Sequence, residues 1–124
     1  MIDFDTMGDW LDEIAEQFPQ EFYTELNGGI LLLPEAMPDP EFPEGEMYFL
    51  GEYCHDEMGR YINLYYGSFA ELFADADEEE LYEELYVTLA HEFTHHIESL
   101  AGEKGLEILD AAELEQFRKE YGIE

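Results

Sequence analysis

The sequence predicts a small α+β protein in which helices come first, a small sheet follows, and further helices end the chain. Two observations predict this order: apolar residues recur at helical spacing near both ends, and short aromatic and aliphatic runs occupy the middle. A third is that no linker, repeat or low-complexity tract divides the 124 residues. Because a chain of this length forms one core, residues 1–124 are expected to be a single domain.

The N-terminal segment predicts two helices. From Phe4 to Phe18, apolar residues recur at helical spacing with acids between them, and Pro19 ends the pattern. A second, short helix is expected over about 21–26, because the Asn-Gly-Gly turn at 27–29 accommodates a left-handed residue.

The middle of the chain predicts a sheet of about three strands. The apolar run 30–33 is typical of a strand covered on both faces, whereas residues 34–46 hold four prolines and are expected to form a loop. Segments 47–53 and 61–66 are rich in aromatic residues and are separated by a turn at 56–59, which indicates an antiparallel hairpin. We therefore expect a small, mostly antiparallel sheet.

Capping boxes, in which a short polar residue precedes Glu by three positions, predict where the later helices begin. The three pairs are Ser68 with Glu71, Asp77 with Glu80, and Asp110 with Glu113. The helix after Asp77 is the long one, because its apolar residues continue at i+3 and i+4 spacing until Gly102, where we expect it to end.

The charge balance excludes some classes of partner. The chain has 33 acidic and 4 basic residues and a formal net charge of −29. Such a chain repels phosphates and anionic lipid surfaces, so neither a nucleic acid nor a membrane is expected as a partner. The absence of a basic or apolar leader in the first residues, and the lone Cys54, predict a soluble cytoplasmic protein.

The residues that carry chemistry are His91-Glu92-Phe93-Thr94-His95, an HExxH motif inside the long predicted helix. His91 and His95 are one turn apart on the same face, so both imidazoles can bind one Zn²⁺. Glu92 is rotated by about 100° from His91, which places its carboxylate beside the open position of the metal. A general base for a hydrolytic water molecule belongs there.

The sequence HEFTHH at 91–96, after a small sheet in so short a chain, resembles the minimal zincin-type metallopeptidases of bacteria. This resemblance implies a single zincin-like domain with Zn²⁺ as cofactor, His91 and His95 as metal ligands and Glu92 as the catalytic base. It also implies a peptide or protein substrate, and the acidic surface favours basic segments. The longer family pattern, HExxHxxGxxD, takes its third ligand from the Asp, but Glu98 and Ala101 stand where its Gly and Asp would be.

The third zinc ligand must therefore come from elsewhere. A helix that runs about one extra turn, to Gly102, carries the chain about 5–6 Å further from the metal, and about two extended residues recover that distance. This reasoning predicts Glu107 as the third ligand, with Asp110 and Glu103 as alternatives. Glu98, on the histidine face, is a further candidate, better suited to hydrogen-bonding an imidazole or to lying in solvent.

Several other residues are expected to have lesser roles. His96 should pack against or hydrogen-bond the segment after Gly102, and Cys54 and His55 should point to opposite faces of a strand, which argues against a second metal site. A phenol that stabilises an oxyanion cannot be chosen among Tyr82, Tyr86 and Tyr121.

Two other functions fit the sequence. One is a non-enzymatic acidic interaction protein that mimics DNA, which the net charge of −29 suggests. The other is a degenerate zincin whose metal only stabilises the fold, which the missing GxxD ending suggests.

Overall fold

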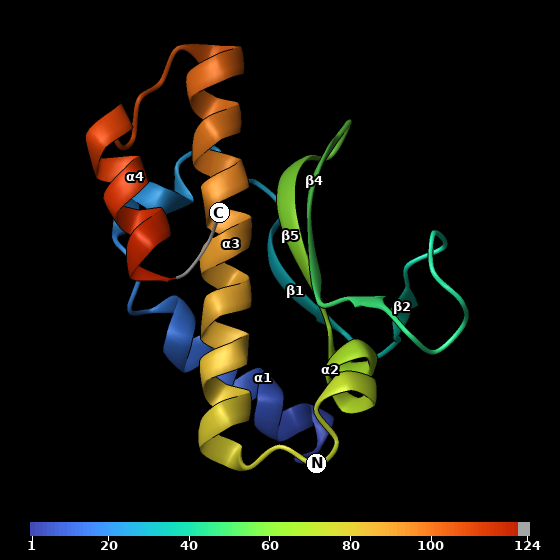
Figure 1. Cartoon of the computed structure of the whole chain (residues 1–124). Helices are drawn as coiled ribbons and strands as arrows, with labels where there is room; N and C mark the ends of the chain where they lie inside the picture. Colours follow the sequence, from blue (N-terminus) through green and yellow to red (C-terminus); the bar gives the residue numbers. More distant parts are fainter. Residues whose placement is uncertain (122–124) are drawn as a thin grey trace.

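The structure is a computed structural model that describes residues 1–121, and it confirms the α+β class (Figure 1). The helices are α1 (Phe4–Ala15), the 3₁₀ helix η1 (Gln20–Tyr23), α2 (Tyr66–Leu72), α3 (Glu78–Lys104) and α4 (Ala111–Glu120). The strands are β1 (Gly29–Leu33), β2 (Met37–Pro38), β3 (Tyr48–Phe49), β4 (Gly51–Asp56) and β5 (Gly59–Tyr65).

The main sheet has the strand order β1-β5-β4 and is mixed rather than mostly antiparallel. The predicted hairpin is present, because β4 pairs antiparallel with β5 and Asp56 lies opposite Gly59. However, β1 pairs parallel with β5, with Gly29 opposite Tyr61. The reason is the long connection after β1: it reverses the chain before β4, so the returning strand β5 runs in the direction of β1 and lies between the other two.

The proline-rich region is more ordered than predicted. Met37 and Pro38 form β2 and pair with Phe49 and Tyr48 of β3 in a separate two-stranded sheet. The expected single strand over 47–53 is therefore divided at Leu50 into β3 and β4. Nor is β1 covered on both faces, since Leu31 is 44% exposed.

Two of the three predicted helix N-caps are present in the structure. The side chain of Asp77 accepts a hydrogen bond from the Glu80 backbone N–H, and Asp110 and Glu113 form a complete capping box. Ser68 is wrong as a cap, because α2 begins earlier, at Tyr66. The Ser68 hydroxyl is buried and accepts a hydrogen bond from the Met37 N–H instead.

The helix ends differ more from the predictions. α1 ends at Ala15, short of Phe18, and the second helix is a single 3₁₀ turn rather than an α-helix. The long helix α3 continues past Gly102 to Lys104 and ends at Gly105, whose φ of 65° is left-handed. The Leu106 N–H bonds the Leu100 carbonyl at 3.1 Å, which closes this end of the helix. The premise that α3 stops at Gly102 is therefore wrong.

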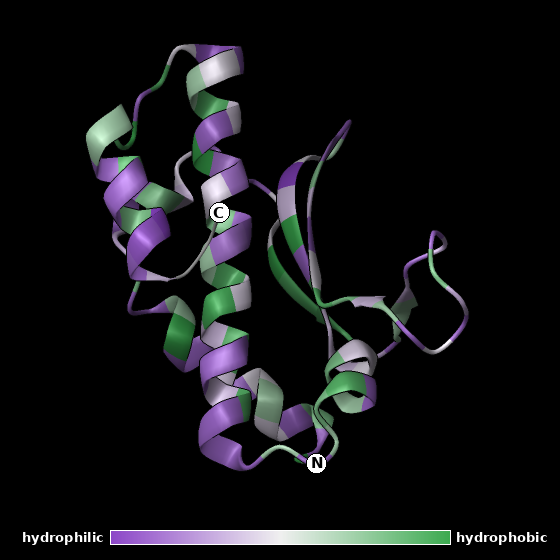
Figure 2. Cartoon of the chain, in the orientation of Figure 1, coloured by the Kyte–Doolittle hydropathy of each residue, from purple (hydrophilic) through white to green (hydrophobic). Residues whose placement is uncertain are grey.

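The core lies where α3 crosses the inner face of the main sheet, and α1 and η1 close it from the other side (Figure 1). Hydrophilic and hydrophobic bands alternate along α3, whereas β1 is hydrophobic along most of its length (Figure 2). In the described part of the chain, no helix is long and apolar enough to cross a membrane. The fully buried large side chains are Met7, Ile14, Ile62, Leu64, Phe69, Leu81, Leu85, Leu89, Phe93, His96, Ile97 and Leu100.

Candidate metal centre

His91 and His95 converge on one point, as the helical spacing predicts. Their Nε2 atoms are 3.1 Å apart, and the two rings stand at 88° to each other. Zinc bonds to nitrogen of roughly 2.0–2.1 Å at a tetrahedral angle place two ligand nitrogens about 3.3 Å apart. Burial and the neighbouring His95 lower the pKa of His91, so its neutral imidazole can offer a lone pair. The two side chains therefore fit a shared zinc ion.

The histidines lie in an open cleft of about 770 Å³ between α3 and β4. Helix α3 supplies one wall, and β3 and β4 supply the other. The lining residues are Phe49, Gly51, Glu52, Tyr53, His55, His91, Glu92, His95, Glu98, Ser99, Gly102 and Glu103.

Glu92 is a buried carboxyl group inside this cleft. It is only 5% exposed. Burial and the negative charge of Glu52 raise the pKa of Glu92 to about 7. A carboxyl group with a pKa near neutrality can both accept and release a proton, which is what a general base in hydrolysis must do.

Gly51 lets strand β4 approach this carboxyl group closely. A Cβ atom on Gly51 would lie 2.7 Å from the Leu64 side chain and 3.2 Å from Oε2 of Glu92. A side chain at this position would therefore displace Leu64 or press against the carboxyl group.

Two acids of α3 that line the cleft are paired with cations. Oε1 of Glu98 accepts a 2.6 Å hydrogen bond from Nη2 of Arg118 in α4. Oε2 of Glu103 accepts one of 2.6 Å from the buried Arg60 and lies 3.2 Å from Nδ1 of His55. Among residues 1–121, Glu52 has no cationic partner, and its carboxylate accepts a hydrogen bond from the Tyr65 hydroxyl.

The structure does not bring the predicted third ligand to the histidines. Glu107 is exposed in the segment after α3 and does not line the cleft, and Asp110 is occupied as the N-cap of α4. Of the candidates, only Glu98 and Glu103 line the cleft with both histidines. Within residues 1–121, no three His, Cys, Asp or Glu side chains are grouped closely enough to hold a metal ion. Because α3 is longer than expected and α4 lies on its far side from the sheet, the chain returns away from the cleft (Figure 1).

His96 is a structural residue, and its two ring nitrogens hydrogen-bond β4 and the turn after η1 rather than the segment after Gly102. It is fully buried, its Nε2–H donates to the Thr24 carbonyl at 2.7 Å, and its Nδ1 accepts from the Tyr53 hydroxyl at 2.8 Å. This arrangement requires a neutral ring, in agreement with the lowered pKa that burial causes. The ring thereby connects α3 to β4 and to the turn after η1.

Sequence reasoning missed the residues that β4 contributes. Gly51, Glu52 and Tyr53 line the cleft opposite the motif, whereas none of Tyr82, Tyr86 and Tyr121 does. The order Gly-Glu-Tyr in an aromatic strand carries no motif that could have indicated this role.

The chain was compared with family models, curated proteins and solved structures. No family model matches it, and no curated protein does. It is similar to a conserved hypothetical protein from Thermus thermophilus, with a TM-score of 0.72 and 32% identity over 81% of this chain and 98% of that chain. The two chains belong to one family. That family relation supports the fold, while the relative's name states no activity.

Proposed function

We propose that this chain is a zinc-dependent metallopeptidase of the minimal zincin type. The observation that supports the proposal best is the cleft itself, where two imidazole Nε2 atoms 3.1 Å apart adjoin a carboxyl group that is 5% exposed. His91 and His95 would hold the metal, with a carboxylate as third ligand. When bound, zinc would polarise the scissile carbonyl group and make a water molecule more acidic.

The chain's own contribution to hydrolysis is the carboxyl group of Glu92. As a general base it would take a proton from the attacking water molecule and later give it to the leaving amine. Its environment suits both steps, because burial and Glu52 raise its pKa to about 7. The neutral imidazole of His96 is committed to Tyr53 and Thr24 and has no part in proton transfer.

The charges in the cleft favour a basic peptide as substrate. Glu98 and Glu103 are already paired with Arg118 and Arg60, whereas Glu52 has no cationic partner among residues 1–121. A lysine or arginine side chain of a peptide would compensate this charge on the β4 side of the cleft. Glu52 is therefore the residue proposed to select basic substrates.

The test combines metal loading with a peptide library. Protein stripped with a chelator and then loaded with Zn²⁺ is expected to bind one zinc ion and to cleave library peptides, with lysine or arginine enriched near the cleavage site. Zinc binding without cleavage would favour the alternative in which the metal only stabilises the fold. An absence of zinc binding would remove the basis for both.

A further inference from the structure

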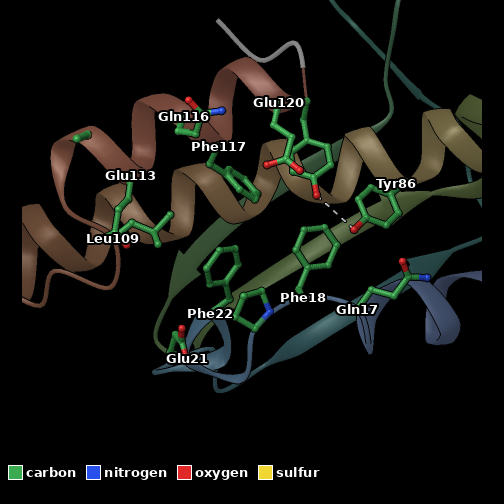
Figure 3. A pocket seen from close by; sticks show the side chains of 13 residues that line it. Gln17, Phe18, Glu21, Phe22, Tyr86, Leu109, Glu113, Gln116, Phe117 and Glu120 are labelled. Atoms are coloured by element: carbon green, nitrogen blue, oxygen red, sulfur yellow. Dashed lines mark hydrogen bonds between the residues drawn. The ribbon is translucent and has the colours of Figure 1, made fainter.

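A second hollow lies apart from the cleft, and none of residues 1–121 lines both. It has a volume of about 530 Å³ and opens between α4, η1 and the N-terminal half of α3 (Figure 3). Pockets of this size, mostly apolar with a few polar groups, are typical small-molecule sites. The residues that line it are Gln17, Phe18, Pro19, Glu21, Phe22, Tyr86, Leu109, Ala112, Glu113, Gln116, Phe117, Glu120 and Tyr121.

The hollow exists because α4 rests on the rest of the protein without burying a residue of its own. Its Phe117 ring contacts Phe22 edge to face at a centroid distance of 5.4 Å, and the Tyr121 ring at its end stacks on Tyr86 at 5.4 Å. These aromatic contacts form walls but do not fill the space between them (Figure 3). The Tyr86, Phe117 and Tyr121 rings are half-buried and keep part of their surface accessible to a ligand, whereas Phe22 is buried.

The charged groups that line the pocket are all negative among residues 1–121. Three carboxylates line it, Glu21, Glu113 and Glu120, and no lysine or arginine from residues 1–121 does. Arg118, on the same helix, is held by Glu98 outside the pocket. Aromatic faces attract cations through their quadrupole, and the nearby carboxylates attract them by charge.

We propose that this pocket binds a small organic cation. Its aromatic or aliphatic body would lie against Phe117 and Tyr86, and its ammonium or guanidinium group would face the carboxylates. This inference does not depend on the proposed peptidase activity, because the pocket and the cleft have no residue in common in the described part of the chain.

The experiment is an NMR titration of the full chain with three probes of matched size: 4-phenylbutylammonium, 4-phenylbutan-1-ol and 4-phenylbutyrate. We expect the cation to bind with a Kd about tenfold lower than the alcohol, and the anion not to bind. The shifts should be confined to α4, η1 and the residues around Tyr86, and added salt should reduce the preference for the cation. Equal Kd values for the cation and the alcohol would overturn the proposal.

Two sets of variants locate the site. Ala112 is exposed on α4 and lines the pocket, so Ala112→Phe should fill the pocket with a ring and abolish binding. Ala101 is exposed on α3 and does not line the pocket, so Ala101→Phe should leave binding unchanged. The triple variant Glu21→Gln, Glu113→Gln, Glu120→Gln should bind the cation and the alcohol equally. Gln at 113 can still accept the Asp110 N–H bond that caps α4.

The controls separate a local effect from the overall charge of −29. A matched triple variant, Glu13→Gln, Glu78→Gln, Glu79→Gln, removes the same charge away from the pocket and should keep the preference for the cation. If both triple variants lose the preference equally, the attraction is only general and the proposal is wrong.

Discussion

Arg118 of α4 holds Glu98 of α3 in a 2.6 Å ion pair beside the two histidines of the candidate metal centre. Glu98 lines the same cleft as His91 and His95, whereas Glu107 does not. The pair therefore keeps a potential third zinc ligand bound to a guanidinium group. This relationship leads to the first prediction.

We expect Glu98→Gln to weaken zinc binding more than Glu107→Gln, because only the former removes a carboxylate from the cleft. Arg118→Met should strengthen zinc binding, since it releases Glu98 from its ion pair. Competition with a chromogenic chelator measures these affinities. The opposite order of the two glutamine variants would restore Glu107 as the third ligand.

His91→Ala or His95→Ala should abolish stoichiometric zinc binding, because their Nε2 atoms lie 3.1 Å apart in the cleft and would both bind the ion. His55→Ala is the matched control. His55 lines the same cleft but is paired with Glu103, so its loss should leave the zinc content unchanged. Metal analysis after dialysis decides the outcome, and full zinc content in both helix variants would refute the site.

Glu92→Gln should retain zinc and lose activity, because the amide keeps the shape of the side chain but cannot accept the proton. Hydrolysis of a peptide identified in the library is expected to fall by about 10² to 10⁴. The zinc content, measured in parallel, should equal that of the wild type. Loss of zinc in this variant would mean that Glu92 is a ligand and that the proposed mechanism is wrong.

The same substitution should also change how the stability of the metal-free protein depends on pH. The pKa of Glu92 is raised from 4.5 to about 7 in the folded state, so between these values the folded chain binds a proton that the unfolded chain has released. The wild type therefore loses stability as the pH rises through this window, by about 3 kcal/mol in total. Glu92→Gln should melt several degrees higher than the wild type at pH 8, and near the same temperature at pH 4. If the difference in melting temperature between wild type and variant stays constant from pH 4 to pH 8, Glu92 is not a buried ionisable group.

Tyr53→Phe should destabilise the fold by about 1–3 kcal/mol, because it leaves Nδ1 of the fully buried His96 without a hydrogen-bond donor. Tyr61→Phe is a suitable comparison, since the Tyr61 hydroxyl bonds the exposed Asp56 and its loss should cost less. Urea denaturation followed by circular dichroism measures both. If both substitutions lower the free energy of unfolding equally, the hydrogen bond between Tyr53 and His96 does not stabilise the packing of α3 on β4.

Features set by residues close together in the chain could be predicted from the sequence. The caps at Asp77 and Asp110, the turn between β4 and β5 and the one-turn spacing of His91 and His95 all depend on neighbours within about four residues. Such interactions leave a pattern in the sequence that can be recognised without knowing the fold. The α+β class follows from the same local periodicities.

Features set by packing between distant segments could not be predicted from the sequence. Whether α3 ends at Gly102 or Gly105 is not decided by the presence of a glycine, because both can end a helix and the Leu100 carbonyl is capped only at the second. The parallel pairing of β1 with β5 depends on where the long connection returns the chain.

The sequence by itself determined the two converging imidazoles and the carboxyl group beside them, because a helix places residues 91, 92 and 95 by its own geometry. Only the tertiary structure decided what surrounds them. Strand β4 brings Gly51 and Glu52 against Glu92 and raises its pKa, and α4 brings Arg118 to Glu98. The physical reason is that burial and charge at a point in space sum over every segment packed there, whereas the sequence orders residues only along the chain.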